Sequence, residues 1–292
     1  MTSAKIICDS VSPQGHRLTT FEVVMHRFVL SEFNTHRVLS KNSASSRAIP
    51  VQKQLARVEA NPAIPLSWPQ EQKGMQGGEE LDEGGRLAAE NVWLRARTSA
   101  AVDAQALIRT GVHKSVVNRL LEPFMWHTVV VTGTAWANFF ALRNNPMAQP
   151  EIRVAAEQMQ QVYAANEPTL LGEGQWHLPY IQGGEYSQHD TETLVQISSA
   201  RCARVSYLTQ TGVRDPQEDL TLYERLISAS PMHASPLEHV ATPAPWNWQL
   251  VTTGDQVTMK GLDVILPKYG NLLGWHQHRF DVEAAKDYKA YA

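Results

Sequence analysis

Residues 32–47 constrain this chain more than any other stretch, because they gather hydrogen-bond donors into a segment with few core-forming side chains. The sequence of this stretch is EFNTHRVLSKNSASSR, with no large apolar side chain after Leu39. It follows a β-rich apolar run from Phe21 to Leu30 and precedes Pro50, where regular structure stops. Guanidinium and hydroxyl donors at this density favour an anion such as a phosphate or a pyrophosphate. The alternative is a solvated, serine-rich loop.

Length and charge limit the classes of protein to which the chain can belong. Its 292 residues suffice for one large domain or two small ones. The net charge of −3 argues against broad binding of polymeric nucleic acid, and no apolar run reaches the ~20 residues of a membrane span. The N-terminus lacks a signal-peptide core, and two cysteines, Cys8 and Cys202, favour neither a disulfide framework nor a zinc site. We expect a cytoplasmic protein without membrane contact.

Apolar periodicity predicts an α/β (α+β) fold with a central, mainly antiparallel sheet packed with long helices. The predicted strands are Ala4–Asp9, Leu18–Leu30, Phe124–Val131 and Leu194–Tyr207. The predicted helices are Val51–Ala60, Leu87–Arg109, Lys114–Leu121, Ala135–Arg143, Pro150–Tyr163 and Pro216–Ser228. The helix Leu87–Arg109 has the strongest helical pattern, and we expect it to cover the sheet.

Three parts are expected along the chain. Residues 1–171 form a core that contains the stretch 32–47, residues 172–193 form an irregular linker, and residues 194–292 complete the same fold. Residues 61–85 are rich in proline and glycine and predict a long loop. This loop is either a functional lid or interface segment, or a poorly ordered insertion.

The spacing inside the opening stretch resembles the signature of the flavin-dependent thymidylate synthases. In this chain His36-Arg37 is followed after seven residues by Ser45 and, two places later, by Arg47. The family signature is Arg-His-Arg-x7-Ser with a further Arg two places on. The first Arg is Thr35 here, and the Tyr that commonly follows the last Arg is Ala48.

Two further segments resemble the same family. Residues 119–123, Arg-Leu-Leu-Glu-Pro, match an Arg-x-x-x-Pro step, which implies that Arg119 contacts the nucleotide. Residues 138–143 match an Asn-Phe-x-x-x-Arg helix, which implies that Asn138 contacts flavin and that Arg143 contacts the pyrimidine. Five helical positions separate Asn138 from Arg143, so their side chains diverge by ~140° and one helix can face two ligands. The alternative is an exposed Arg that complements the helix dipole.

The segment His233–His239 resembles the His-x-Ser-Pro-x-Glu-His motif of the family, but it stands in the opposite order relative to the first motif. Two arrangements explain this order: a permuted chain, or a duplication in which residues 274–279 are a degenerate second Arg-His-Arg region. From the residues alone, His233, Glu238 and His239 could instead form a structural turn or a metal site.

The resemblance implies a methyltransferase that moves a one-carbon unit from methylenetetrahydrofolate to C5 of dUMP, with FAD as cofactor and NADPH as reductant. It assigns the residues as follows. Arg143 is catalytic; Glu32, Ser45, Ser46, Arg47, Arg119 and Arg143 bind the substrate; His36, Arg37, Asn138, His233 and His239 bind the flavin; no metal is expected. The family also implies a homo-oligomer, a tetramer with active sites where subunits meet.

Glu32 leaves the identity of the pyrimidine base in the substrate undecided. It stands where the family usually has Gln, and a carboxylate accepts a hydrogen bond from an exocyclic amine, so dCMP is an alternative substrate. A non-catalytic nucleotide-binding protein of this fold also stays open, as does a metal-dependent hydrolase, which the eleven histidines suggest. No glycine-rich dinucleotide motif, P-loop or nucleophile elbow occurs in the sequence.

Overall fold

The computed structural model describes residues 1–207, 215–244, 249–253, 256–260 and 270–286. Its centre is a five-stranded sheet with strand order β3-β4-β2-β1-β5. The strands are β1 (Ser3–Val11), β2 (Arg17–His26), β3 (Ser40–Ser43), β4 (Trp126–Gly133) and β5 (Thr169–Leu170). All neighbours pair antiparallel except β1 and β5, so the predicted α/β class with a mainly antiparallel sheet is confirmed.

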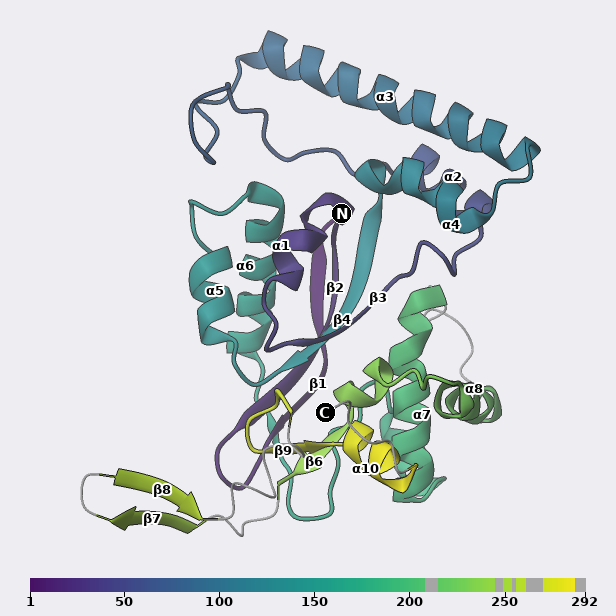
Figure 1. Ribbon diagram of the computed structural model, residues 1–292. Helices are drawn as coiled ribbons and strands as arrows, with labels where there is room; N and C mark the ends of the chain where they lie inside the picture. The colour runs from purple at the N-terminus through teal and green to yellow at the C-terminus, as the bar shows by residue number, and fades with distance from the viewer. Residues whose placement is uncertain (208–214, 245–248, 254–255, 261–269, 287–292) are drawn as a thin grey trace.

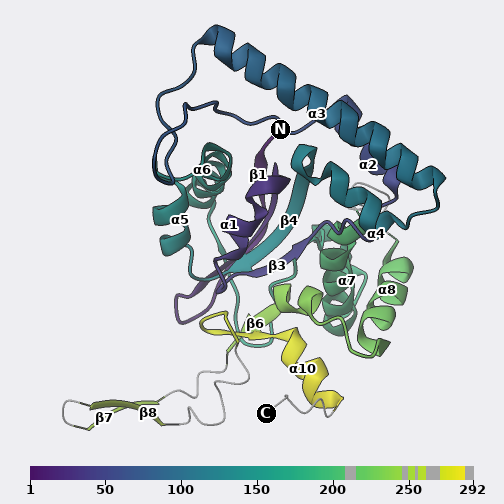
Figure 2. The same ribbon diagram turned by 45° about the horizontal axis from the view of Figure 1, so that its top comes forward.

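One face of the sheet packs on α5 (Ala137–Arg143) and α6 (Pro150–Ala165), as Figures 1 and 2 show. Alternate residues of β2 and β4 point to this face and are fully buried: Phe21, Val23, Met25, Val129 and Val131. From α6 they meet Ile152 and Met159, which are also fully buried. Burying each such side chain stabilises the fold by ~1.5–3 kcal/mol.

The expectation that the longest helix covers the sheet is wrong. Helix α3 (Glu83–Arg109) packs on α2 (Val51–Ala60) and on the 3-10 segment η2 (Asn118–Phe124), beside the short α4 (Lys114–Val117). Its buried residues are small, Ala101 and Ala104, while Val92 and Val102 of the expected apolar stripe are 52% and 56% exposed. The side of α3 that carries Ala101 and Ala104 therefore rests on another helical layer, and α6 packs against the sheet in its place.

A second correction concerns residues 194–207, for which the sequence predicts a strand. They belong to α7 (Thr191–Ala203) and η4 (Arg204–Tyr207). The Asp190 side chain caps the helix by accepting from the Thr193 N–H at 2.8 Å. Every residue from Ile197 to Ala203 is buried, so the segment lacks the amphipathic period that marks a helix and resembles a buried strand.

The C-terminal elements lie against the other face of the sheet. They are far from β3 and β4 in sequence but contact both strands through η5 (Ser235–His239). The remaining elements are η1 (Arg27–Val29), α1 (Leu30–Asn34), η3 (Gly183–Ser187), α8 (Pro216–Ser228), β6 (Ala241–Pro243), β7 (Gln249–Thr253), β8 (Gln256–Lys260), β9 (Trp275–Gln277) and α10 (His278–Ala285). Within the described residues, no helix is both long and apolar enough to cross a membrane.

A buried ion cluster fixes α7 against α8 and η3. The Arg201 guanidinium, 1% exposed, donates to the Asp219 carboxylate at 2.7 Å and to Glu185 at 2.6 Å. Arg204 donates to the other Asp219 oxygen at 2.6 Å. A buried arginine is tolerated only when it is paired in this way, so the cluster accounts for the burial of charge inside an otherwise apolar helix.

Candidate active site

The Arg143 guanidinium is hydrogen-bonded to the segment that follows α1. Its Nε donates to His36 Nε2 at 2.9 Å, and its Nη2 donates to the Glu32 carbonyl oxygen at 3.1 Å and to Thr35 Oγ1 at 3.0 Å. Within the described part of the chain, Nη1 makes no hydrogen bond. One edge of the guanidinium is therefore fixed by protein acceptors, and the other edge keeps two free donors.

His36 is held as a neutral acceptor in this arrangement. Its ring is 8% exposed and lies edge-on to Phe139, with ring centroids 4.9 Å apart. Burial, together with the Arg143 and Lys41 charges, lowers the pKa of His36. The Lys41 ammonium donates to the His36 carbonyl oxygen at 2.5 Å, and burial lowers the pKa of Lys41 to about 8. The cluster thus concentrates positive charge beside an uncharged imidazole.

A second cationic cluster gathers around the carboxylate of Glu122. This carboxylate accepts from Ser46 Oγ at 2.6 Å, from Arg119 Nη1 at 2.8 Å and from Arg27 Nη2 at 3.2 Å. Arg47 is exposed, and its backbone N–H contacts Ser45 Oγ at 3.3 Å. Ser46 and Arg119, which the sequence predicts to bind the substrate, therefore already contact an internal anion, the Glu122 carboxylate.

Strand β3 separates the two clusters. Its four residues, Ser40–Ser43, span ~10 Å at ~3.3 Å per residue, with the Arg143 cluster before its start and the Glu122 cluster after its end. Asn271, from the C-terminal part, donates to the Val38 carbonyl oxygen at 2.9 Å and to Ser40 Oγ at 3.1 Å. The stretch 32–47 is thus an ordered rim rather than a solvated loop along most of its length.

The third predicted motif, His233–His239, contributes His239 to a buried network of hydrogen bonds. A chain of four hydrogen bonds joins five buried polar side chains in the order Ser10, His177, Thr20, Thr132 and His239. The lengths along this chain are 2.9, 2.8, 2.6 and 2.8 Å. It links β1, β2 and β4 to the segment 172–190 and to η5, so it ties the C-terminal part to the sheet.

Both histidines of this chain are neutral. Burial lowers the pKa of His177 to about 3 and that of His239 to about 3. His239 is 0% exposed, and its Nε2 has no hydrogen-bond partner within the described residues. No surface ligand can reach this nitrogen in the observed conformation. His233, at the other end of the motif, is exposed and apart from the chain.

The structure therefore brings together some predicted residues and not others. Glu32, His36 and Arg143 form one cluster, and Ser46 and Arg119 contact another through Glu122. Arg37 and Asn138 are exposed and flank the first cluster, Arg37 by sequence and Asn138 on the same helix as Arg143. Both side chains are exposed donors.

Sequence reasoning missed three residues of this region. Glu122 was visible as an i,i+3 partner of Arg119. Lys41 lay inside the stretch 32–47 without an assigned role. Asn271 gave no signal, because its contact with Ser40 joins residues 231 positions apart.

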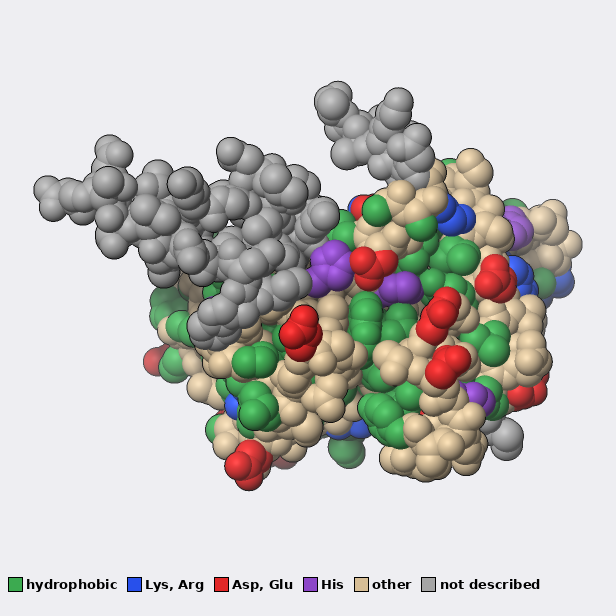
Figure 3. All heavy atoms as spheres, turned by 90° about the horizontal axis from the view of Figure 1, so that it is seen from below, with side chains coloured by type: hydrophobic (Ala, Val, Ile, Leu, Met, Phe, Trp, Pro, Cys, Tyr) green, Lys and Arg blue, Asp and Glu red, His purple; other side chains and the backbone are tan. Residues whose placement is uncertain are grey.

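Figure 3 shows the end of the molecule that carries β6, β9 and α10. On the visible part of this face, acidic and histidine side chains are more prominent than lysine and arginine (Figure 3). The cationic groups described above lie around α1, α5 and α4 instead (Figure 1).

A family model described as thymidylate synthase complementing protein matches residues 9–169, more than half of the chain. The chain belongs to this family. The matched segment contains the stretch 32–47, Arg119 and Arg143, so the resemblance stated from these motifs is confirmed. The His233–His239 segment lies outside the match. Within this family, the rim and the Arg143 cluster are the natural candidates for an active site.

Solved structures show a more distant likeness. A UMP/dUMP methylase, PolB from Streptomyces cacaoi bound with 5-Br UMP, is 19% identical, with 56% of this chain and 89% of that chain covered and a TM-score of 0.47. The flavin-dependent thymidylate synthase ThyX from Helicobacter pylori, complexed with FAD and dUMP, is 15% identical, with 50% and 68% covered and a TM-score of 0.36. No curated protein matches the sequence. Family membership rests on the family model.

Proposed function

We propose that the protein transfers a one-carbon unit from methylenetetrahydrofolate to C5 of dUMP with FAD as cofactor. The observation that carries this proposal is the Arg143 guanidinium, fixed along one edge by His36, Thr35 and Glu32 with Nη1 free among the described residues. A guanidinium held in this way can stabilise the charge that grows on the pyrimidine oxygens as C5 becomes nucleophilic. Because the donors are already oriented, little reorganisation accompanies the reaction.

The nucleotide phosphate would bind at the far end of β3. Arg47 is exposed there, and Arg119 and the Ser45–Ser46 hydroxyls are within the same cluster. Glu122 keeps the Arg119 side chain oriented but competes for its charge. An incoming phosphate would take over part of the contact that Glu122 now makes.

The flavin would be held by His36, Arg37, Asn138 and exposed His233. When bound, it supplies hydride, with NADPH as the reductant. The neutral His36 imidazole would orient the ring system by hydrogen bonding, and Arg37 and Asn138 would bind its polar edge. His239 would act indirectly, by holding η5 in place through Thr132.

We further propose a homo-oligomer, a tetramer, in which one nucleotide contacts the two ends of β3 from different subunits. The separation of the clusters by the length of β3 supports a shared site. Exposed apolar residues of α3, including Val92 at 52% and Val102 at 56%, support an interface on that helix. Two free cysteines support a cytoplasmic setting.

Residues 194–292 would complete one fold with residues 1–171 rather than form an independent domain. The Thr132–His239 hydrogen bond and the packing of Leu18 on Trp275 and Leu272 support this arrangement. Residues 172–193 would then be a structural bridge, since His177 and Tyr180 are buried.

Two variants test the proposal, because one should impair nucleotide binding and the other the rate of methyl transfer. Arg47→Ala should weaken dUMP binding about ten- to a hundredfold, the range for a contact to a charged group. Arg143→Ala should lower the single-turnover rate of methyl transfer by ~10²–10³ and change dUMP affinity far less. Wild-type rates and affinities in both variants would refute the proposal. If the one-carbon unit is transferred faster to dCMP than to dUMP, the substrate is the cytosine nucleotide, with Glu32 accepting a hydrogen bond from its exocyclic amine.

A further inference from the structure

A cavity of about 560 Å³ lies between α2 and the beginning of β4. It opens on the face of the sheet opposite Arg143. Trp126 and Thr128 of β4 line the cavity, whereas the alternate residues Val129 and Val131 belong to the core beneath α5. The volume is within the range of small-molecule sites in proteins. The cavity is therefore separate from the Arg143 cluster.

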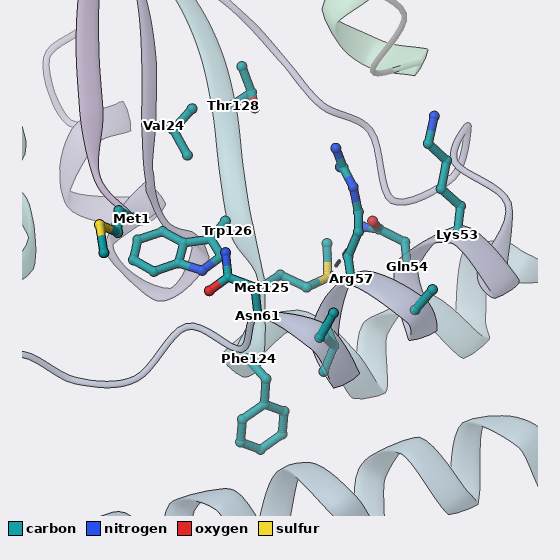
Figure 4. Close-up of a pocket in the computed structure, with 13 residues that line it drawn as sticks. Met1, Val24, Lys53, Gln54, Arg57, Asn61, Phe124, Met125, Trp126 and Thr128 are labelled. Carbon is teal, nitrogen blue, oxygen red and sulfur yellow. Dashed lines mark hydrogen bonds between the residues drawn. The ribbon is translucent and has the colours of Figure 1, made fainter.

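The walls of the cavity are mainly apolar. Phe124 and Met125 are 6% and 5% exposed, Val58 is 1% exposed, and Val24 with the Trp126 indole continues the apolar lining. Figure 4 shows Trp126 across the cavity from α2. The Trp126 indole and the Met125 thioether favour a ligand with a flat apolar body, while the Phe124 ring packs on Trp93 of α3, with ring centroids 5.2 Å apart (Figure 4).

Two cations stand along one wall, at i and i+4 of α2. In Figure 4 the Lys53 and Arg57 side chains rise from the helix in the same direction. Neither makes an ion pair with any described residue, and burial of part of the side chain lowers the pKa of Arg57. Two like charges at this spacing repel each other, so an anion between them would be stabilised.

Two residues that line the cavity carry polar groups without good partners. The Trp126 Nε1 is buried without a hydrogen-bond partner among the described residues. Gln54 is 2% exposed, and the one hydrogen bond of its side chain in the described chain runs to the Met125 sulfur at 3.5 Å. Among the residues that the structure describes, no carboxylate lines the cavity. Because the Trp126 Nε1 has almost no accessible surface, a ligand does not reach it in the observed conformation, and the place of the anionic group is assigned from Lys53 and Arg57 instead.

We propose that this cavity binds an anionic small molecule with a flat apolar body, whose carboxylate or phosphate lies between Lys53 and Arg57 and whose body packs on Trp126. The proposal does not depend on the reaction at Arg143. Aromatic carboxylic acids and aromatic phosphate monoesters share this chemistry, and the two head groups can be told apart by direct comparison.

Calorimetric titration of the full chain with three probes of one shape tests the proposal. The probes are 2-naphthoate, 2-naphthyl phosphate and neutral 2-naphthol, at pH 7. At least one anion should bind saturably, at least tenfold more tightly than the naphthol, because the naphthol lacks the charge-assisted contact. The tighter of the two anions identifies the head group.

Three variants locate the binding. The double variant Lys53→Gln/Arg57→Gln should lose about tenfold in affinity for the anion and keep its affinity for the naphthol. Trp126→Phe should weaken all three probes. The matched double variant Arg95→Gln/Arg109→Gln removes two exposed charges from α3, outside the cavity, and should bind like the wild type.

The proposal is overturned by any of three results. They are no saturable binding of either anion, equal affinity for the anions and the naphthol, and equal loss in the α2 and α3 double variants. Thermal unfolding of each variant separates lost binding from lost folding. Because Lys53 and Arg57 are exposed, their replacement should leave the fold intact, and a selective loss of anion affinity then reports on the cavity.

Discussion

The two histidine motifs of this chain lie in opposite environments. His36 stands at a rim with an arginine donor on its Nε2 and with exposed donors on both sides. His239 is fully buried at the end of a hydrogen-bonded chain that runs through Thr132, Thr20 and His177 to Ser10. Similar motif residues therefore do different work. We propose that the first set contacts a ligand, while the second joins the C-terminal part to the sheet through the Thr132–His239 hydrogen bond.

Desolvation keeps both imidazoles neutral, because charging a buried imidazole in an apolar environment is unfavourable. His36 Nε2 accepts from Arg143 and His239 Nδ1 is hydrogen-bonded to Thr132, while His239 Nε2 has no partner among the described residues. Both His36, 8% exposed, and His239, 0% exposed, are buried, so the two motifs differ in the exposure of the residues around the imidazole rather than in the burial of the ring.

The largest expected effect is on acid stability. The pKa values of His177 and His239 are about 3 in the folded state, well below the ordinary 6.5, so the unfolded state binds more protons as the pH falls. Stability from these groups is complete above pH 6.5 and declines as the pH falls toward 3. Each histidine contributes a slope of up to ~1.4 kcal/mol per pH unit.

Urea unfolding between pH 6.5 and 5 measures this slope above the range where most carboxylates titrate. A free energy of unfolding that does not change over this interval would show that the buried chain is not formed in solution.

The next effect concerns the centre of the buried chain. Thr132→Val keeps the shape of the side chain but removes the hydroxyl that contacts both Thr20 and His239. Leaving buried partners unsatisfied should lower the free energy of unfolding by ~1–3 kcal/mol. The matched variant Thr98→Val removes a hydroxyl from the exposed side of α3 and should change stability by less than ~0.5 kcal/mol. Equal losses of stability in Thr132→Val and Thr98→Val would show that the buried hydrogen-bonded chain contributes no more to stability than an exposed hydroxyl.

The smallest effect is expected at the phosphate end of the rim. Glu122→Gln removes the charge that competes for Arg119 and Arg27. Because partly exposed ion pairs are worth up to ~1 kcal/mol, dUMP affinity should rise by up to about fivefold in a titration. Glu90→Gln, which breaks the Arg86 pair on α3, should leave affinity unchanged. A clear fall in affinity for Glu122→Gln would mean that this carboxylate orients the arginines more than it neutralises them.

Sequence patterns were most informative where one face of an element is buried. The alternation in β2 and β4 predicted both strands, and the stretch 32–47 predicted a donor-rich site before any contact was known. The pattern failed for α7, because a helix buried on all sides has no polar face. It also failed for the partner of α3, since an apolar stripe shows that a helix is covered and does not show what covers it.

The contacts of the site depend on long-range folding. Arg143 and His36 are 107 positions apart, and the residues Thr132 and His239 are equally far apart. The family motifs indicated which side chains to consider. They did not show that Thr35, in place of an arginine, accepts from Arg143, or that Glu122 lies among the predicted phosphate ligands.

The flavin-to-protein ratio of purified variants tests most directly whether the rim binds the ligand and the buried chain holds the fold. Absorbance in the flavin bands should fall strongly in His36→Ala and in Asn138→Ala, since we propose that both side chains contact the cofactor. Thr132→Val should keep a ratio near that of the wild type at temperatures where its unfolding curve shows a folded protein. Loss of flavin in folded Thr132→Val, with wild-type flavin content in His36→Ala and Asn138→Ala, would contradict the account.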